Sequence, residues 1–501
     1  MNVDYVLNFL QGNLSPKDLE RHKFGEVFTP LELVDEMLHS LPPHVWKNKH
    51  MKWLDPASGI GNFPIKALLG QSEGKFKYPG LMHGLADEIP NEAARCKHIL
   101  EHMLFLIDIN ENNNKSSRML LKKLCPDAVP NVSYIDKQNG FLTSKPIVFN
   151  SKTYTEFDVI MGNPPFNRGA VRAALVTDKT RKRKKELGLE DEQGESNYWV
   201  KFVEKAVGGY LKEGGYLLFI HPITWFKHDR LGAHEMILSR QLHELKIYKN
   251  NGPGAAFGKA GKISVAWYCL ENAQVRHKTL IKYGADPDYT EELMLSPDSI
   301  LILRYNSIYQ KILAKSKLFG KDGVLRHKTL NRCDSSGSGK YKLVSDIHDS
   351  GSMDYVTSSV AHADQFEPKV IVGGIHKPIV YYDKAGEIGI FAKGQRHYFV
   401  GDREHLDKIN DFFKTKLSTL LLDFIKFEQD FIRPNFYPGV QEFPGKITDA
   451  SLAAFYGFTK KEMGIIDTMA HPIHVHTLHK ATSGCSGKQR WKTYKKKMAK
   501  T

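Results

Sequence analysis

Segments with strand-like and helix-like patterns alternate from about residue 50 to residue 271. Short apolar runs, of which 103–108 and 216–220 are examples, have the pattern of buried strands, and amphipathic segments lie between them. A chain that alternates in this way buries its strands in a mostly parallel sheet and covers both faces with helices. We therefore predict an α/β fold, with a doubly wound, Rossmann-like domain over residues 24–271.

The remaining chain has a different character. Residues 1–23 read as a short helical lead-in. Residues 272–467 begin with a polar, connecting stretch and continue with short strands and helices, which predicts a mixed α+β domain. Residues 468–501 contain no acid and supply eight positive charges, so we expect a basic, disordered tail.

Composition restricts the class of protein. The formal net charge of +15 favours a polyanionic partner. The five cysteines show no CxxC spacing, so we predict neither disulfides nor a thiolate zinc site, and a reducing compartment. No signal sequence and no run of 18 apolar residues is evident, which predicts a soluble protein that is not secreted.

Asn163-Pro164-Pro165-Phe166 follows one of the predicted strands, after a turn at Gly162. Ligands of open α/β sheets bind just outside the carboxyl ends of the strands, where this tetrapeptide would lie. The alternative is a strand end that the prolines merely stiffen.

The tetrapeptide suits one difficult reaction, attack by the exocyclic amine of a nucleobase on a methyl group. The amine lone pair is delocalised into the ring, so the nitrogen needs acceptors on its N–H bonds before it becomes nucleophilic. The side-chain oxygen of Asn163 and the carbonyl oxygen of Pro164 offer two acceptors. The prolines stiffen the loop, and Phe166 offers a ring that can stack on a base.

A second candidate site follows the predicted strand 51–55. Asp55 ends that strand, and Gly59 and Gly61 allow close approach of the backbone to a ligand. The loop has neither a GxGxxG pattern nor a phosphate-binding lysine, which argues against a dinucleotide site and a P-loop. A carboxylate beside free backbone amides suits a zwitterion, here a sulfonium amino acid.

Three more positions extend the candidate site. Asp108 ends the strand 103–108, where a carboxylate can bind ribose hydroxyls or simply cap the next helix. Thr29 and Pro30 read as the cap and first residue of a helix whose N-terminus suits a carboxylate. Phe257, in a glycine-rich loop, could face a base from the side opposite Phe166.

These motifs, in this order, closely resemble the gamma class of amino-DNA methyltransferases, the N6-adenine enzymes of restriction–modification systems. The resemblance rests on Phe-Thr-Pro at 28–30, Asp-Pro-Ala-Ser-Gly-Ile-Gly-Asn-Phe at 55–63, Ile-Asp at 107–108 and Asn-Pro-Pro-Phe at 163–166. It covers residues 24–271 closely and extends more loosely to 427–436 and 456–462. The chain departs from the family in three respects. Pro64 stands where a large aliphatic residue is usual, the acid that follows the third strand is ambiguous, and the basic excursion at 179–194 is unusual.

The resemblance implies methyl transfer from S-adenosyl-L-methionine to N6 of an adenine flipped out of double-stranded DNA. It implies no metal. The implied catalytic residues are Asn163, Pro164, Pro165 and Phe166, with Phe257 at the target base. The implied cofactor-binding residues are Phe28, Thr29, Pro30, Asp55, Ala57, Gly59, Gly61, Asn62, Phe63, Asp108, Ile109 and Asn139. Residues 272–467 would then recognise the DNA target.

The resemblance also bears on partners and location. It implies double-stranded DNA and a separate cognate restriction endonuclease as partners, no membrane, and a place on DNA in a prokaryotic or viral-host cytoplasm. Only 23 residues precede Phe24, so we expect no N-terminal nuclease domain. Two alternatives remain open: a glutamine methyltransferase acting on protein, and a DNA-binding subunit without activity. The basic charge and the large C-terminal domain favour DNA methylation.

Basic and aromatic residues are interleaved in the C-terminal domain as in a base-reading surface. They are Lys369, His376, Lys377, Tyr381, Lys393, Arg396, Tyr398 and Arg433. The histidines of the tail, at 471, 474, 476 and 479, match no strong metal-binding pattern.

Overall fold

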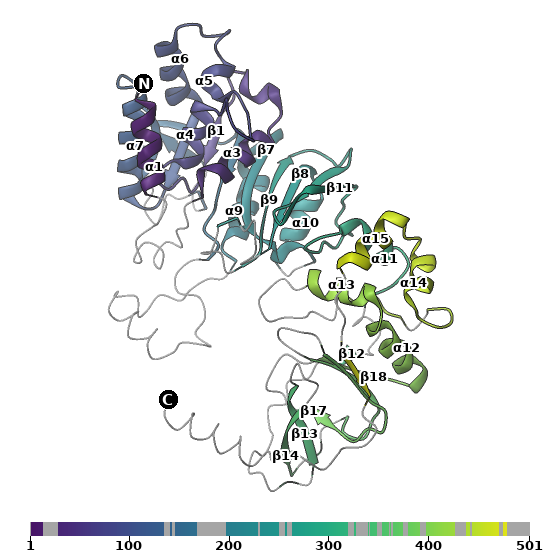
Figure 1. Cartoon of the computed structure of the whole chain (residues 1–501). Coiled ribbons are helices and arrows are strands. Elements are labelled where there is room, and N and C mark those ends of the chain that lie inside the picture. The colour runs from purple at the N-terminus through teal and green to yellow at the C-terminus, as the bar shows by residue number, and fades with distance from the viewer. Residues whose placement is uncertain are drawn as a thin grey trace. The chain divides into compact units, whose positions relative to one another are not determined.

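The computed structural model of the chain divides into two compact units, residues 1–301 and 302–501 (Figure 1). The structure describes residues 2–13, 29–134, 141–142, 146–167, 197–228, 231–249, 256–257, 263–318, 325–326, 339, 341–347, 353–359, 361, 364–373, 379–390, 397–425, 437–440, 443–469 and 474–477.

The first unit alternates strands and helices, as predicted. Its strands are β1 (Trp53–Asp55), β2 (Leu104–Asp108), β3 (Asn131–Tyr134), β4 (Ile147–Phe149), β5 (Lys152–Tyr154), β6 (Phe157–Gly162), β7 (Leu211–Pro222), β8 (Gln241–Tyr248), β9 (Val265–Glu271), β10 (Thr279–Tyr283) and β11 (Asp286–Leu293). Its α-helices are α1 (Val3–Gly12), α3 (Leu31–His39), α4 (Asn62–Leu69), α5 (Gly80–Gly84), α6 (Glu92–His98), α7 (Glu111–Leu124), α9 (Trp199–Lys205) and α10 (Ala233–Leu238). Short 3-10 or π-helical turns are η1 (Pro43–Trp46), η2 (Ile99–Met103), η4 (Ala206–Tyr210) and η5 (Ile223–Trp225).

Nine strands form one sheet in the order β11-β10-β8-β9-β7-β6-β1-β2-β3. The strands from β3 to β7 pair in parallel, and β9 lies antiparallel between β7 and β8. Chain order reverses between β1 and β6, which are neighbours although a long stretch of sequence separates them. Such a switch point is where open α/β sheets bind ligands, at the carboxyl ends of the strands.

Helices cover both faces of this sheet, which confirms the predicted doubly wound fold. One face packs against α3, α4, α5, α6 and α7 and contributes Val159, Met161, Leu218 and Ile220 to one hydrophobic core. Side chains alternate across a strand, so Ile160 and Phe219 point to the other face, on the side of α9 and α10. Packed side chains therefore hold β6 and β7 on both faces of the sheet.

The first unit extends beyond the predicted boundary at residue 271. The stretch after it was expected to be connecting chain, but Thr279–Tyr283 and Asp286–Leu293 form β10 and β11, and β10 pairs in parallel with β8. The division between the units falls at Leu301 and Ile302. The sequence pattern also predicts a helix over residues 235–242, but α10 lies at 233–238 and β8 begins at Gln241.

The second unit is a mixed α+β domain, as predicted. Its strands are β12 (Leu325–Arg326), β13 (Tyr341–Ile347), β14 (Met353–Ser358), β15 (Lys369–Gly373), β16 (Ile379–Asp383), β17 (Gly389–Ile390), β18 (His397–Val400) and β19 (His474–Thr477). Its helices are α11 (Asn306–Leu313), α12 (Arg403–Phe413), α13 (Lys416–Phe424), α14 (Asp449–Tyr456) and α15 (Lys460–Met469). The sheets are β12-β18-β15-β16-β19 and β14-β13-β17.

Two predictions for the second unit are wrong in part. The sequence pattern predicts one helix over residues 404–427. The structure has two helices there, because Thr415 caps α13 with its side chain, which accepts a bond from the Ser418 N–H. The tail expected from residue 468 to be disordered includes the end of α15 and strand β19, which pairs in parallel with β16. Within the tail, residues 470–473 and 478–501 lie outside the described residues.

The expected base-reading residues do not all lie on a surface. Lys369, Tyr381 and Tyr398 are buried, with exposed fractions of 0%, 3% and 1%. Lys369 Nζ lies 3.1 Å from Asp383 Oδ2, and the Tyr398 hydroxyl donates to Asp364 over 2.7 Å. These three therefore stabilise the interior of the unit. His376, Lys377, Lys393, Arg396 and Arg433 lie outside the described residues.

None of the helices that the structure describes is both long and apolar enough to cross a membrane. Cys96, Cys125 and Cys269 are buried free thiols.

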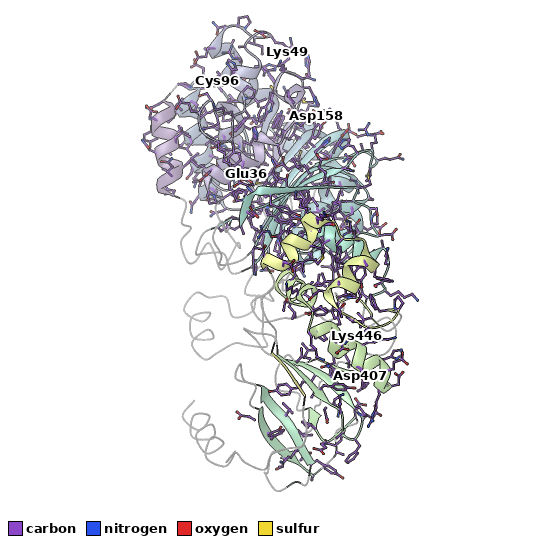
Figure 2. All side chains as sticks on the ribbon, turned by 45° about the vertical axis from the view of Figure 1, so that its right-hand side comes forward. Glu36, Lys49, Cys96, Asp158, Asp407 and Lys446 are labelled. Atoms are coloured by element: carbon purple, nitrogen blue, oxygen red, sulfur yellow. The ribbon has the colours of Figure 1, made fainter. Side chains whose placement is uncertain are left out.

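The buried ion pair of the second unit gives a stability prediction. Asp383→Asn removes the partner of a fully buried ammonium, so we expect the free energy of unfolding to fall by about 3–5 kcal/mol. The matched control is Asp407→Asn; Asp407 is labelled in Figure 2. Asp407 pairs with Lys384 at 3.5 Å, and both side chains are more than half exposed. That control should cost at most about 1 kcal/mol. Differential scanning calorimetry measures both, and equal losses would contradict the prediction.

Candidate active site

The site is built where β1 and β6 end side by side. The register pairs Trp53 with Val159 and Leu54 with Ile160, so Asp55 and Gly162 end the two strands close together. A Cβ atom placed on Gly162 would lie 2.7 Å from Asp55 Oδ1. The absence of a side chain at Gly162 therefore lets the predicted catalytic loop contact the predicted cofactor loop.

Asp55 is buried, with an exposed fraction of 1%. Burial raises the pKa of its carboxyl well above the ordinary value, the bond from the Ala57 N–H opposes that rise, and the charge of Asp108 adds to it. The carboxylate form is therefore costly without a positive partner, and a cationic ligand would stabilise it.

Asp108 ends β2 and holds the loop that follows β1. Its Oδ2 accepts a bond from the Gly59 N–H at 2.9 Å, and its Oδ1 accepts from the Asn110 N–H at 2.7 Å and Asn113 Nδ2 at 3.2 Å. Burial raises the pKa of Asp108 to about 6, while these three donors lower it. Both predicted readings of this acid are compatible with its position, since it lies at the strand end and also bonds to the start of α7.

The glycine loop is held by its neighbours. Gly59 and Gly61 have φ angles of +53° and +98°, which favour glycine. The Ser117 hydroxyl donates to the Gly59 carbonyl at 3.1 Å. Among the described residues, Ser58 Oγ and Asn62 Oδ1 are buried and have no hydrogen-bond partner. Buried polar atoms normally have partners, so these two atoms are available to a ligand that approaches this loop.

Thr29 closes the loop from the other side, because its carbonyl accepts a bond from Asn62 Nδ2 at 2.9 Å. The expected cap is wrong by one residue. Pro30 is the N-cap of α3, and no side chain caps the helix. The Thr29 backbone is instead used to hold Asn62.

Glu36 fixes helix α3 to the sheet (Figure 2). Its carboxylate accepts bonds from the Tyr248 hydroxyl at 2.9 Å and from Trp267 Nε1 at 3.2 Å, and it forms an ion pair with Lys246. These partners come from β8 and β9. The segment 29–30 is therefore positioned by strands far from it in sequence.

The Asn-Pro-Pro-Phe loop leaves β6 at the same edge of the sheet. Asn163 is half-buried and its Oδ1 atom is buried, and Pro164 is buried. The Tyr198 N–H donates to the Phe166 carbonyl at 2.9 Å, which fastens the end of the loop to the start of α9.

Phe166 and Phe257, the two aromatic residues predicted to face a base, lie together. Their ring centroids are 6.2 Å apart and the ring planes meet at 69°, an edge-to-face contact. Both rings are half-buried against the core. A base that stacks on Phe166 and faces Phe257 would have to separate the two rings.

The remaining residues predicted to bind the cofactor differ in how far their side chains are exposed. Ile109 follows Asp108 and is 52% exposed, which leaves its side chain open to a ligand. The Phe63 side chain is 3% exposed and belongs to the core, so only its backbone is available at the start of α4. Phe28, Asn139 and the basic excursion at 179–194 lie outside the described residues.

Several residues that shape the site were not predicted. Gly162 was predicted only as a turn, although it is the contact with Asp55. Ser117, Glu36 and His221 act through partners distant in sequence, and no local pattern marks them. A buried polar residue between apolar neighbours, as at His221 in the strand 216–222, is the one signal available.

No group of three or more His, Cys, Asp or Glu residues is arranged to hold a metal ion among the residues that the structure describes. The side chains of the tail histidines are outside that set.

Comparison with known proteins confirms the expected resemblance. Residues 87–252 match the model of the family described as Eco57I restriction-modification methylase. A relative from Mycoplasma pneumoniae, described as an uncharacterized adenine-specific methylase, is 39% identical over 89 residues, which are 17% of this chain and 19% of the relative. The match thus spans about a fifth of that relative's length.

Solved structures of restriction–modification proteins are also similar to the chain. The DNA-bound type ISP enzyme LlaBIII is 11% identical, with 82% of this chain and 38% of that chain covered and a TM-score of 0.45. The methyltransferase subunit of a type I restriction–modification system from Streptococcus thermophilus is 12% identical, with 54% and 50% covered and a TM-score of 0.32.

The contact of Gly162 with Asp55 gives a prediction. Gly162→Ala adds a Cβ 2.7 Å from Asp55 Oδ1 at a residue whose φ is +147°, so we expect unfolding free energy to fall by about 1–3 kcal/mol. Gly214→Ala is the control, because Gly214 also has a positive φ but a Cβ there meets nothing within 4 Å. Urea unfolding compares the two, and an equal or smaller loss for Gly162→Ala would show that the close approach is unimportant.

Proposed function

We propose that the chain is a DNA methyltransferase that transfers the methyl group of S-adenosyl-L-methionine to the N6 amine of an adenine flipped out of double-stranded DNA. The observation that carries this proposal is the contact between Asp55 and Gly162. It brings a buried acid suited to a cationic amino acid next to the Asn-Pro-Pro-Phe loop. The family match over residues 87–252 includes that loop and supports the same reaction.

The residues around the glycine loop fit this cofactor. Asp55 would meet its ammonium group, and Asp108 and the exposed Ile109 would meet the nucleoside. Ser58 Oγ and Asn62 Oδ1 are buried polar atoms available to a ligand, and the backbone at 29–30 borders them through Asn62. When bound, S-adenosyl-L-methionine supplies a methyl group made electrophilic by the sulfonium.

The catalytic loop would act on the amine. The side-chain oxygen of Asn163 and the carbonyl of Pro164 would accept its two N–H bonds and so free the nitrogen lone pair. The prolines and the bond from the Tyr198 N–H to the Phe166 carbonyl hold the loop in one conformation before substrate binds. The protein's contribution is therefore to orient the amine and to localise its lone pair.

Phe166 and Phe257 would bind the flipped base. Stacking of a base on an aromatic side chain contributes roughly 1–3 kcal/mol, whereas an edge-to-face aromatic pair is worth about 0.5–1.5 kcal/mol. Exchanging the ring contact for base stacking is therefore favourable or near neutral. The pair thus separates for a base at little net cost.

Two proposals concern the rest of the chain. The second unit would recognise the DNA target, in keeping with its size and the chain's charge of +15. A separate restriction endonuclease would be a partner of the system.

The competing function, methylation of a protein glutamine, uses an amide nitrogen at the same loop.

The test is transfer of a tritiated methyl group from S-adenosyl-L-methionine to unmodified genomic DNA, followed by nucleoside digestion. Label in N6-methyladenine supports the proposal. Label in added protein and none in DNA would indicate a methyltransferase that acts on protein glutamine. No label at all would indicate a DNA-binding subunit without activity.

Asn163→Ala removes one acceptor for the amine, and we expect kcat to fall on the order of 10²- to 10³-fold. The dissociation constant for S-adenosyl-L-methionine, measured by calorimetry, should change little. The matched control is Asn48→Ala, an exposed asparagine that bonds only locally, to the His50 N–H. Full activity of Asn163→Ala would remove this residue from the proposed chemistry.

Cofactor affinity should depend on pH through Asp108. Its pKa of about 6 means that acidification from pH 7 to pH 5 protonates most of the carboxyl and removes an acceptor for ribose hydroxyls. We expect the dissociation constant to rise about tenfold over that range. In Asp108→Asn the affinity should be weaker at pH 7, and only the pH dependence due to Asp55 should remain. An unchanged pH profile in that variant would exclude Asp108 as the titrating group.

A further inference from the structure

We propose that His221 and Tyr268 form a positioning pair that sets the place of Phe166 through helix α9. This inference rests on the proposed function, because it concerns the loop that would hold the target adenine. Each acts through a short series of contacts that ends at the Phe166 carbonyl.

His221 lies beside the end of β6, the strand that leads into the Asn-Pro-Pro-Phe loop. Strand β7 pairs in parallel with β6, and Phe219 is opposite Gly162, so His221 follows two residues beyond the last pair. Residues two apart on a strand share a face, which places His221 on the side of α9 together with Phe219. It is fully buried there, with an exposed fraction of 0%.

The hydrogen bonds of His221 define one form of its ring. Nδ1 lies 3.1 Å from the Pro222 carbonyl, which can only accept, so Nδ1 carries the proton. Nε2 then accepts from the Tyr268 hydroxyl at 3.0 Å. Burial lowers the pKa of His221 to about 3, which keeps the ring neutral over the range in which enzymes are assayed. Each ring nitrogen therefore makes one defined hydrogen bond, and the two bonds together fix the orientation of the ring plane.

That ring plane supports Trp199. The two rings stack with centroids 3.8 Å apart and an interplanar angle of 11°, and Trp199 is 1% exposed. Trp199 is the first residue of α9, and the N–H of the preceding residue, Tyr198, donates to the Phe166 carbonyl at 2.9 Å. The orientation of His221 thus determines where the helix begins, and the helix start determines where Phe166 lies.

A purely structural role is a less complete explanation of this arrangement. A buried imidazole and a buried hydroxyl are costlier to desolvate than phenylalanines of similar shape, which would fill the same space. Polar groups that bond in one geometry select a single ring orientation, which apolar packing alone does not. The pair is placed where such selection matters, at the start of the helix that fastens the catalytic loop.

The experiment uses Tyr268→Phe and His221→Phe in the full chain. Tyr268→Phe deletes one hydroxyl and frees the His221 ring to rotate, so we expect kcat to fall on the order of tenfold. The dissociation constant for S-adenosyl-L-methionine should stay the same, because Asp55 and Asp108 do not contact the pair. His221→Phe should lower kcat by a similar factor, and the double variant by no more than either single one, because the two residues act as one unit.

Tyr283→Phe is the matched control. Tyr283 is an equally buried tyrosine of the same sheet, 2% exposed, whose hydroxyl donates to Glu291 on β11, away from the site. It should keep the wild-type kcat. Melting temperatures of all variants show whether the fold is equally affected.

The outcomes separate this inference from the proposed function. Absence of methyl transfer by the wild-type chain would refute the proposed function itself. An active wild type with Tyr268→Phe at full kcat would overturn the positioning role, as would losses that simply add in the double variant. A fall in kcat matched by equal losses in the Tyr283→Phe control would also overturn it.

Discussion

The buried carboxylate of Asp55 is the point on which the arrangement of the site depends. It ends β1 against Gly162, where a side chain would collide with it, and the loop that follows it is held by Asp108 at the end of β2. Two acids that are both buried repel each other, so each carboxylate form is costly until a positive charge arrives. The site is thereby electrostatically complementary to a cation and unfavourable for an anion.

The same contact joins the proposed cofactor loop to the proposed base-binding loop, although more than a hundred residues separate Asp55 from Gly162 in the sequence. Because Gly162 touches Asp55, the place where a cofactor would bind and the place where a base would be held cannot shift independently. At its other end the Asn-Pro-Pro-Phe loop is fastened to α9, whose first turn packs on His221. A loop held at both ends loses little conformational entropy when substrate binds, which favours a fast chemical step.

The elements predicted well are those whose pattern is local. The acids at strand ends, the glycines of the loop after β1 and the prolines after β6 lie where the local pattern places them, and the alternation of strands and helices reflects the sheet directly. The hairpin of β10 and β11 was missed because it lies at the edge of the sheet, where β11 is largely polar. Lys369 was grouped with a base-reading surface because basic and aromatic residues are interleaved around it, and its buried partner Asp383 is not visible to a local pattern. The same limit applies to Glu36 and His221, whose partners come from distant strands.

Strand β9 has a consequence for the order in which the first unit can fold. Strands β8, β10 and β11 join the rest of the sheet only through β9, which is inserted between β7 and β8 and is the later of the three in sequence. During synthesis the strands that carry the site can pair as they emerge, while β8 must wait, unpaired, until residues 265–271 arrive. Strand edges exposed in this way invite aggregation, and closing a non-local pairing is slow. The insertion of β9 is therefore one step at which nascent chains of this protein are exposed to misassembly.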